Sequence, residues 1–415
     1  MIPIGLLSRL EAASHRSAGY RWSALGITTV SAATNAALAT AIGPLAPLLQ
    51  REFQVSRAEI GLVTSALFLS AALSAPFAGR TSDRIGERRV LLISSLIAGV
   101  AAICLAQVPV FWAFLAVCLL IGFGSGMQNP AGSAAIMRWF PQRQRGVAMG
   151  IRQTGIPIGG ILSATVWSWV AAAQGWRAAY VVGGVVTLIG AALLFAAYFD
   201  PARPKGGAQA EPRSFRDIFR DSQLWWLALI FNCQVIVQFA ATTYLVLFLE
   251  EGANVPYVVG TSLFALLNAV ALGARIGWGL LSDRRFGGRR KPVLTIIVVL
   301  TLAGTIVAAL LPGATPVWLA VILAALLGIS AFAWTAIVGA LTIETAGRAS
   351  AGTAMAMLTV VGSPGQLVGP PLFGLLRDQT GSYQIAWLAL AGVVLVGLIA
   401  VIPIRERTAP GARSA

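Results

Sequence analysis

A series of twelve long apolar runs constrains this chain more than any other feature. A transmembrane helix needs about 20 mainly apolar residues. Only 11% of the residues are charged, against about 25% in soluble domains, so lipid must surround most of the chain. We therefore expect an all-α membrane protein with twelve transmembrane helices. The runs cover residues 24–49, 59–80, 90–107, 110–138, 146–171, 177–198, 223–248, 258–282, 292–312, 316–343, 349–376 and 385–404.

The one long connection between runs divides the chain into two similar parts. Residues 199–222 are rich in proline, glycine and charge, which is typical of a linker in the cytosol. The predicted organisation is a cytoplasmic tail, a six-helix half, the cytoplasmic linker, a second six-helix half and a cytoplasmic tail. These parts cover 1–22, 23–198, 199–222, 223–404 and 405–415.

The distribution of basic residues predicts the orientation. If both termini are cytoplasmic, 24 lysines and arginines lie inside and four lie outside. Cytoplasmic loops of membrane proteins carry such an excess, so this orientation is favoured. Arg152 and Arg275 are the two that lie within runs. The net charge of +15 is explained by topology, and we expect no nucleic-acid partner.

Several other classes of function lack the residues that they need. Cys104, Cys118 and Cys233 lie inside apolar runs without metal-like spacing, and His15 is the only histidine. No phosphate-binding loop or nucleotide fingerprint is present. We find no nucleophile–base pair, so we expect neither an enzyme with catalytic residues nor a metal or cofactor.

A polar segment occurs once in each half of the chain. Residues 79–89 read GRTSDRIGERR, and residues 279–291 read GLLSDRRFGGRRK. This repeated segment resembles the loop signature of the major facilitator superfamily, which joins the second and third helices and recurs between the eighth and ninth. The resemblance covers essentially the whole chain. It implies two pseudo-symmetric six-helix halves that alternate access to a central site.

The resemblance also implies that the two polar segments act as cytoplasmic latches between access states. The candidate gating residues are Gly79, Asp83, Arg84, Gly86 and Arg88 in the first copy, and Gly279, Asp283 and Arg284 in the second. Arg138 is the expected partner of Asp83, and Glu344 with Arg348 would serve Asp283. The alternative is that these charges only keep a loop in water and set topology.

Arg275 is the most informative single residue. It lies eight residues before Asp283, about 12 Å deeper in the bilayer. A charge there costs at least about 2.5–3.5 kcal/mol on insertion scales, and no aspartate or glutamate lies deep in a run. The position resembles the eighth-helix arginine of monocarboxylate, oxalate/formate and nitrate porters, which implies binding of a substrate anion. Ala75 stands where nitrate porters carry a second arginine, which weakens the nitrate interpretation.

Arg152 is a second candidate anion contact, in the fifth run. The resemblance places the fifth and eighth helices opposite one another, so that Arg152 and Arg275 could converge on one anion. A guanidinium suits a carboxylate because it donates two parallel hydrogen bonds. The alternative is that Arg152 extends its charge to the cytoplasmic interface.

Polar and aromatic residues in the runs are candidates for the rest of a substrate cavity. Each amide could equally hydrogen-bond a neighbouring helix. The candidates are Asn35, Gln128, Asn129, Gln238, Tyr244, Asn268 and Trp334.

These observations predict a secondary transporter for a small organic anion, in particular a carboxylate. The expected mechanism is alternating access with proton symport or anion exchange, so the partners are the anion, protons or a counter-anion, and the lipid bilayer. We expect a multi-pass monomer in a bacterial inner membrane. The alternative is a multidrug/proton antiporter, which usually needs a buried carboxylate that this sequence lacks.

Overall fold

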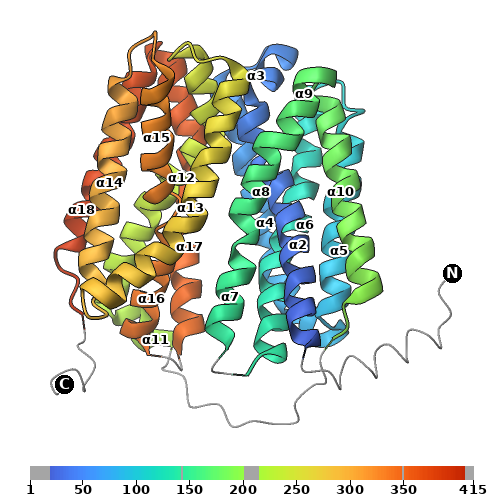
Figure 1. The fold of residues 1–415 in the computed structure, drawn as a ribbon, viewed down its shortest axis with the longest axis vertical. Coiled ribbons are helices and arrows are strands. Elements are labelled where there is room, and N and C mark those ends of the chain that lie inside the picture. Colours follow the sequence, from blue (N-terminus) through green and yellow to red (C-terminus); the bar gives the residue numbers. More distant parts are fainter. Residues whose placement is uncertain (1–18, 142–143, 201–214, 348–349, 407–415) are drawn as a thin grey trace. The chain divides into compact units, whose positions relative to one another are not determined.

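Every regular element in the described part of the chain is a helix (Figure 1). The structure is a computed structural model. It describes residues 19–141, 144–200, 215–347 and 350–406, and only the backbone of residues 83 and 215–217. The predicted tail 1–22, linker 199–222 and tail 405–415 lie largely outside the described residues.

The helices group into two compact units, which we call the N-terminal and C-terminal units. The N-terminal unit comprises Met1–Phe53 and Ala66–Gly207, and the C-terminal unit comprises Gln54–Ser65 and Ala208–Ala415. Helix α4 (Arg57–Ile85) therefore begins in the C-terminal unit and continues in the N-terminal unit. The predicted domain boundaries at 198 and 223 stay predictions.

The N-terminal unit contains the helices that precede the linker. They are α2 (Tyr20–Thr40), α3 (Ile42–Phe53), most of α4, α5 (Glu87–Leu105), α6 (Phe111–Trp139), α7 (Arg145–Gln153), α8 (Gly155–Leu162), the π-helical turn η1 (Ser163–Trp167), α9 (Ser168–Gln174) and α10 (Trp176–Ala197). Helix α5 packs along α6 and α10, and α2 packs along α8. Glycines permit these close approaches, because a Cβ at Gly124 or Gly184 would overlap the backbone of α5.

The C-terminal unit contains the remaining helices. They are α11 (Phe215–Arg220), α12 (Ser222–Glu251), α13 (Tyr257–Arg285), α14 (Lys291–Leu310), α15 (Val317–Ile329), α16 (Thr335–Ala346), α17 (Ala351–Thr380) and α18 (Tyr383–Val401). Helix α12 packs against α17 and α18, α13 packs against α15, and α14 packs against α18.

The helices confirm the all-α fold with twelve membrane crossings that the apolar runs predict. Ten helical stretches of the described chain are long and apolar enough to span a bilayer. The two shorter helices α15 and α16 together cover the tenth predicted run, and α17 covers the eleventh. Predicted and observed ends agree to about one helical turn. The chain is therefore a multi-pass membrane protein.

The first polar segment is not the loop that the sequence suggested. Helix α4 continues to Ile85 and α5 begins at Glu87, so only Gly86 separates them. Gly86 has φ +93°, which favours glycine, and a Cβ there would also overlap the Asp200 carboxylate. The chain reverses at one residue because that residue has no side chain.

In each unit, an acidic residue caps the N-terminus of the helix that begins at the end of the polar segment. This acidic residue lies just after the last helix of the unit. The backbone N–H of Arg88 donates to Asp200 Oδ1 (2.8 Å). In the C-terminal unit, the N–H of Lys291 donates to Glu406. A carboxylate stabilises a helix N-terminus. Burial raises the pKa of the Asp200 carboxyl above its usual value. The hydrogen bond from the Arg88 N–H and the charge of Arg138 oppose this rise without cancelling it.

Candidate functional site

The gating residues of the N-terminal unit form ion pairs near Gly86. Arg138 pairs with Glu87 at 2.9 Å, and the Glu87 side chain is fully buried. The guanidinium of Arg88 lies over the rings of Phe195 and Phe199, at 5.2 and 5.0 Å. The side chain of Asp83 lies outside the described residues, so its pairing with Arg138 stays a prediction.

In the C-terminal unit, one arginine joins two of the predicted gating acids. Arg290 pairs with Asp283 at 2.7 Å and with Glu344 at 3.4 Å. Sequence reasoning did not single out Arg290, although it belongs to the basic run of the second polar segment. Arg348 lies outside the described residues. Arg284 is exposed, and a Cβ at Gly79 or Gly279 would meet no atom within 4 Å.

Arg152 is enclosed inside the N-terminal unit, with 1% of its surface exposed. Its Nη1 donates to Asn129 Oδ1 (3.1 Å) and its Nη2 donates to the Gln128 carbonyl (2.6 Å). A Cβ at Gly132 would overlap the guanidinium, so the glycine makes room for it. Its Nε has no hydrogen-bond partner among the residues that the structure describes. In the described part of the chain, no carboxylate pairs with Arg152.

Asn35 and Gln128 belong to a buried polar network between α2, α5 and α6. Asn35 Nδ2 donates to Ser95 Oγ (3.1 Å), and Gln128 Nε2 donates to Ser95 Oγ (3.0 Å) and Ser31 Oγ (3.1 Å). Both amides are almost fully buried. Here their N–H groups hold helices together, and their role as substrate contacts stays a prediction.

Arg275 lies beside a break in the tenth membrane crossing. Residues Ser330–Trp334 separate α15 from α16. Arg275 Nε donates to the Phe332 carbonyl (3.2 Å), and Trp278 Nε1 donates to the Ile329 carbonyl (2.6 Å). Two side chains of α13 therefore satisfy carbonyls that the break leaves without a helical partner. No signal in the sequence predicts this break, because no proline lies in or near it.

The terminal nitrogens of Arg275 have a different status from its Nε. Arg275 is largely buried. Neither Nη1 nor Nη2 makes a hydrogen bond with any residue that the structure describes, and no described carboxylate pairs with either. A guanidinium that is anchored through Nε and keeps both Nη groups available has the geometry for bidentate binding of an oxyanion.

Other candidates of the C-terminal unit lie in two places. Trp334 follows the break, and its Nε1 donates to Gln238 Oε1 (2.9 Å). The Trp334 ring meets Phe231 edge to face, at 4.9 Å. Asn268 donates to Phe264 in its own helix (2.9 Å). The structure thus brings Arg275, Trp334 and Gln238 to helices that adjoin the break.

Tyr244, a residue of α12, lies away from the break and contacts the first residue of α4. Its hydroxyl donates to the Arg57 carbonyl (2.5 Å). Arg57 also pairs with Glu251 (2.9 Å) and Asp378 (3.4 Å), and the hydroxyl of Tyr383 donates to Glu251 (2.6 Å). Tyr244 is therefore part of an ionic cluster at helix ends, and its predicted contact with substrate remains untested.

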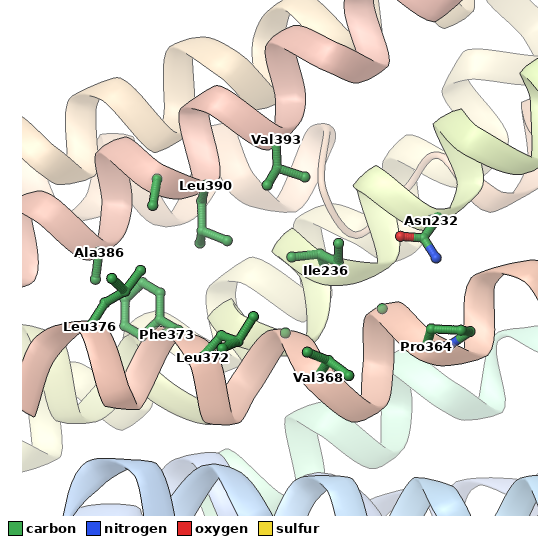
Figure 2. Close-up of a pocket in the computed structure, with 13 residues that line it drawn as sticks. Asn232, Ile236, Pro364, Val368, Leu372, Phe373, Leu376, Ala386, Leu390 and Val393 are labelled. Carbon is green, nitrogen blue, oxygen red and sulfur yellow. The ribbon is translucent and has the colours of Figure 1, made fainter.

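An apolar pocket of about 360 Å³ lies between α12, α17 and α18 (Figure 2). Its lining is aliphatic and aromatic, with residues such as Ile236, Val368, Phe373 and Leu390. Asn232 is its one polar side chain and is already hydrogen-bonded to the Val361 carbonyl (2.7 Å). Because none of the described residues that line it is charged, this pocket is unsuited to an anion.

Comparison with known proteins gives one family. The family model described as "Major Facilitator Superfamily" matches residues 28–363 and 277–415. A protein of Cupriavidus necator named "Probable sulfoacetate transporter" is 28% identical over 86% of this chain and 88% of its own length. The gentisate transporter of Corynebacterium glutamicum is 27% identical over 80% of this chain and 76% of its own.

A solved structure supports the same fold. A bacterial homologue of the human lysosomal transporter Spinster superposes with a TM-score of 0.76 and 18% identity. The superposition covers 93% of this chain and 96% of the other.

Proposed function

Because this chain belongs to the Major Facilitator Superfamily, we propose that it is a secondary transporter for small organic anions that carry a carboxylate. The observation that carries the proposal is the environment of Arg275, a membrane-embedded cation with no carboxylate partner among the described residues and with both Nη groups available. An embedded charge without a fixed counter-charge is costly. A substrate anion would supply that counter-charge.

The named relatives agree with an anionic substrate. Sulfoacetate and gentisate, the compounds in their names, each carry a carboxylate. One ends in a sulfonate and the other in a phenolic ring, so the carboxylate is the group that they share. We therefore assign the carboxylate to Arg275 and leave the rest of the substrate to the residues around the break.

The remaining candidates take supporting roles in this proposal. Trp334 and Gln238, with Asn268, would contact the body of the substrate. Arg152 is not available to an anion in this conformation, and it would become a second anion contact only in another access state, after its Nη groups leave Asn129 and the Gln128 carbonyl. Asn35, Gln128 and Tyr244 would contribute only after their present hydrogen bonds open.

We further propose alternating access by movement of residues 23–198 against 223–404, in a bacterial inner membrane with both termini in the cytoplasm. The polar segments around Asp83 and Asp283 would stabilise one access state. Coupling would be proton symport, with the proton carried on the substrate or on peripheral groups, or anion exchange. The chain would act as a monomer and catalyse no reaction.

Uptake into proteoliposomes tests the assignment. The wild-type chain, Arg275→Ala and Arg275→Lys are compared for uptake of labelled gentisate and sulfoacetate. Arg285→Ala is the matched control, because Arg285 is an exposed arginine at the end of the same helix. Loss of a charged hydrogen-bonding partner costs about 1.5–3 kcal/mol per bond, so Arg275→Ala should lower uptake at least about 100-fold.

Arg275→Lys keeps the charge but loses the fork of donors, so its uptake should fall between wild type and Arg275→Ala. Arg285→Ala should transport like the wild type. Full uptake by both Arg275 variants would refute the assigned role.

A further inference from the structure

The break in the tenth crossing leaves several backbone N–H groups without a partner among the described residues. In a continuous helix each N–H bonds the carbonyl four residues earlier. Here the N–H of Phe332 reaches Leu327 (3.2 Å) and that of Ala333 reaches Ser330 (3.1 Å). The N–H groups of Trp334, Thr335 and Ala336 make no hydrogen bond with any group in the described part of the chain. Donors at the start of α16 are therefore unused.

Several carbonyls around the same break are occupied. Trp278 Nε1 donates to the Ile329 carbonyl, and Arg275 Nε donates to the Phe332 carbonyl. The Ser330 hydroxyl donates to the Leu326 carbonyl (2.6 Å). An unpaired backbone group in hydrocarbon is costly, so membrane proteins leave such groups only where a cavity or ligand reaches them. At the start of α16 the Phe332 carbonyl is already bonded by Arg275, so the free N–H groups there need an acceptor from elsewhere.

Arg275 points to where this acceptor would lie. The Phe332 carbonyl is the one that the Ala336 N–H would bond in a continuous helix, and the Nε of Arg275 has replaced that N–H. The guanidinium therefore adjoins the N-terminus of α16. Thr335 is half-buried and Ala336 is exposed, so this helix end is accessible.

We propose that the N-terminus of α16 and Arg275 form one oxyanion site, in which the N–H groups of Thr335 and Ala336 bind the substrate's carboxylate together with the Nη groups of Arg275. This inference rests on the proposed function and names the rest of that site. Helix N-termini bind anions through free N–H groups and the helix dipole, and interrupted membrane helices provide such ends at mid-bilayer. The Thr335 hydroxyl, which makes no hydrogen bond with described residues, is a further donor.

The arrangement favours ligands with one compact oxyanion head. A carboxylate or a sulfonate offers oxygens to both sets of donors, whereas an ester or a primary amide of the same acid lacks the charge. The test therefore uses gentisate and sulfoacetate as probes, with gentisamide as the neutral analogue.

The decisive comparison is between two variants whose new side chains have the same shape and differ in charge at the start of α16. Binding of the probes to the purified full-length chain in detergent is measured by calorimetry for Ala336→Asp and Ala336→Asn. A carboxylate at this position occupies the free N–H groups and repels the probe. Ala336→Asp should therefore bind at least about 30-fold more weakly than Ala336→Asn, a difference of about 2 kcal/mol.

A control and a second variant keep the test decisive. Ala351→Asp places the same charge at the start of α17 and should leave affinity unchanged. If Ala336→Asp does not fold, Ala336→Pro removes only one N–H, and proline is tolerated in the first helical turn. It should weaken binding about tenfold, because one charge-assisted hydrogen bond is lost. Gentisamide should not distinguish wild type from any of these variants.

The outcomes separate this inference from the proposed function. Equal affinity in Ala336→Asp and Ala336→Asn, together with weaker binding in Arg275→Lys, would overturn the α16 site and leave the anion carrier standing. No binding of either probe by the wild type, with no effect of Arg275→Lys, would overturn both.

Discussion

Arg152 and Arg275 are both arginines inside membrane crossings, and neither pairs with a carboxylate among the described residues, yet their surroundings differ. Arg152 is enclosed, and both of its Nη groups already donate to α6, at Asn129 and Gln128. Within the described part of the chain, Arg275 is anchored only through Nε, beside a helix end whose N–H groups have no partner. Burial of a cation is therefore not sufficient to mark a ligand site. Hydrogen-bond donors that lack partners and surround an accessible position indicate a ligand site more specifically.

The comparison implies that Arg152 stabilises the N-terminal unit in this conformation, and the largest expected effect tests that. Gly132→Ala places a Cβ where the Arg152 guanidinium lies. Displacing it would lose two hydrogen bonds from a charged group, so the free energy of unfolding should fall by about 3 kcal/mol. The measurement is the Tm in detergent.

Gly79→Ala is the matched control, because a Cβ at Gly79 meets no atom within 4 Å. Alanine is the better helix former, by about 1 kcal/mol, so this variant should melt at the same temperature or higher. An unchanged Tm in Gly132→Ala would show that Arg152 is held loosely and would weaken the contrast between the two arginines.

A smaller effect sharpens the other side of the comparison. Trp278→Phe removes the N–H that satisfies the Ile329 carbonyl at the break. The loss of one hydrogen bond, about 1 kcal/mol, should lower probe affinity about fivefold, because the start of α16 is held less precisely. Trp318→Phe, at an exposed tryptophan of α15, should have no effect. Equal effects of the two changes would show that the break does not depend on Trp278.

The sequence predicts the fold well and the site only in part, for physical reasons. The length of apolar runs is set by the bilayer, so each crossing was visible without tertiary information. Arg275 was visible because a charge in hydrocarbon is rare. The break at Ser330–Trp334 was not visible, since no proline interrupts that run and its carbonyls are satisfied from α13, far away in sequence.

The polar segments show the same limit. The repeated aspartates were evident, but the helical continuation of α4 to Ile85 depends on a reversal at Gly86 against Asp200, which lies more than 100 residues later. Likewise, the link between Asp283 and Glu344 passes through Arg290. Such pairings depend on which helices are neighbours, and composition does not contain that information.

Ligand-induced thermal stabilisation of Arg152→Lys and Arg275→Lys tests the central claim most directly. A ligand that binds the folded state stabilises it by about 2.7 kcal/mol at a hundredfold excess over Kd. With gentisate or sulfoacetate as ligand, Arg152→Lys should have a lower Tm without ligand and a normal shift on adding it. Arg275→Lys should keep the wild-type Tm and lose the shift. The reverse pattern, with the shift lost in Arg152→Lys and kept in Arg275→Lys, would contradict the account.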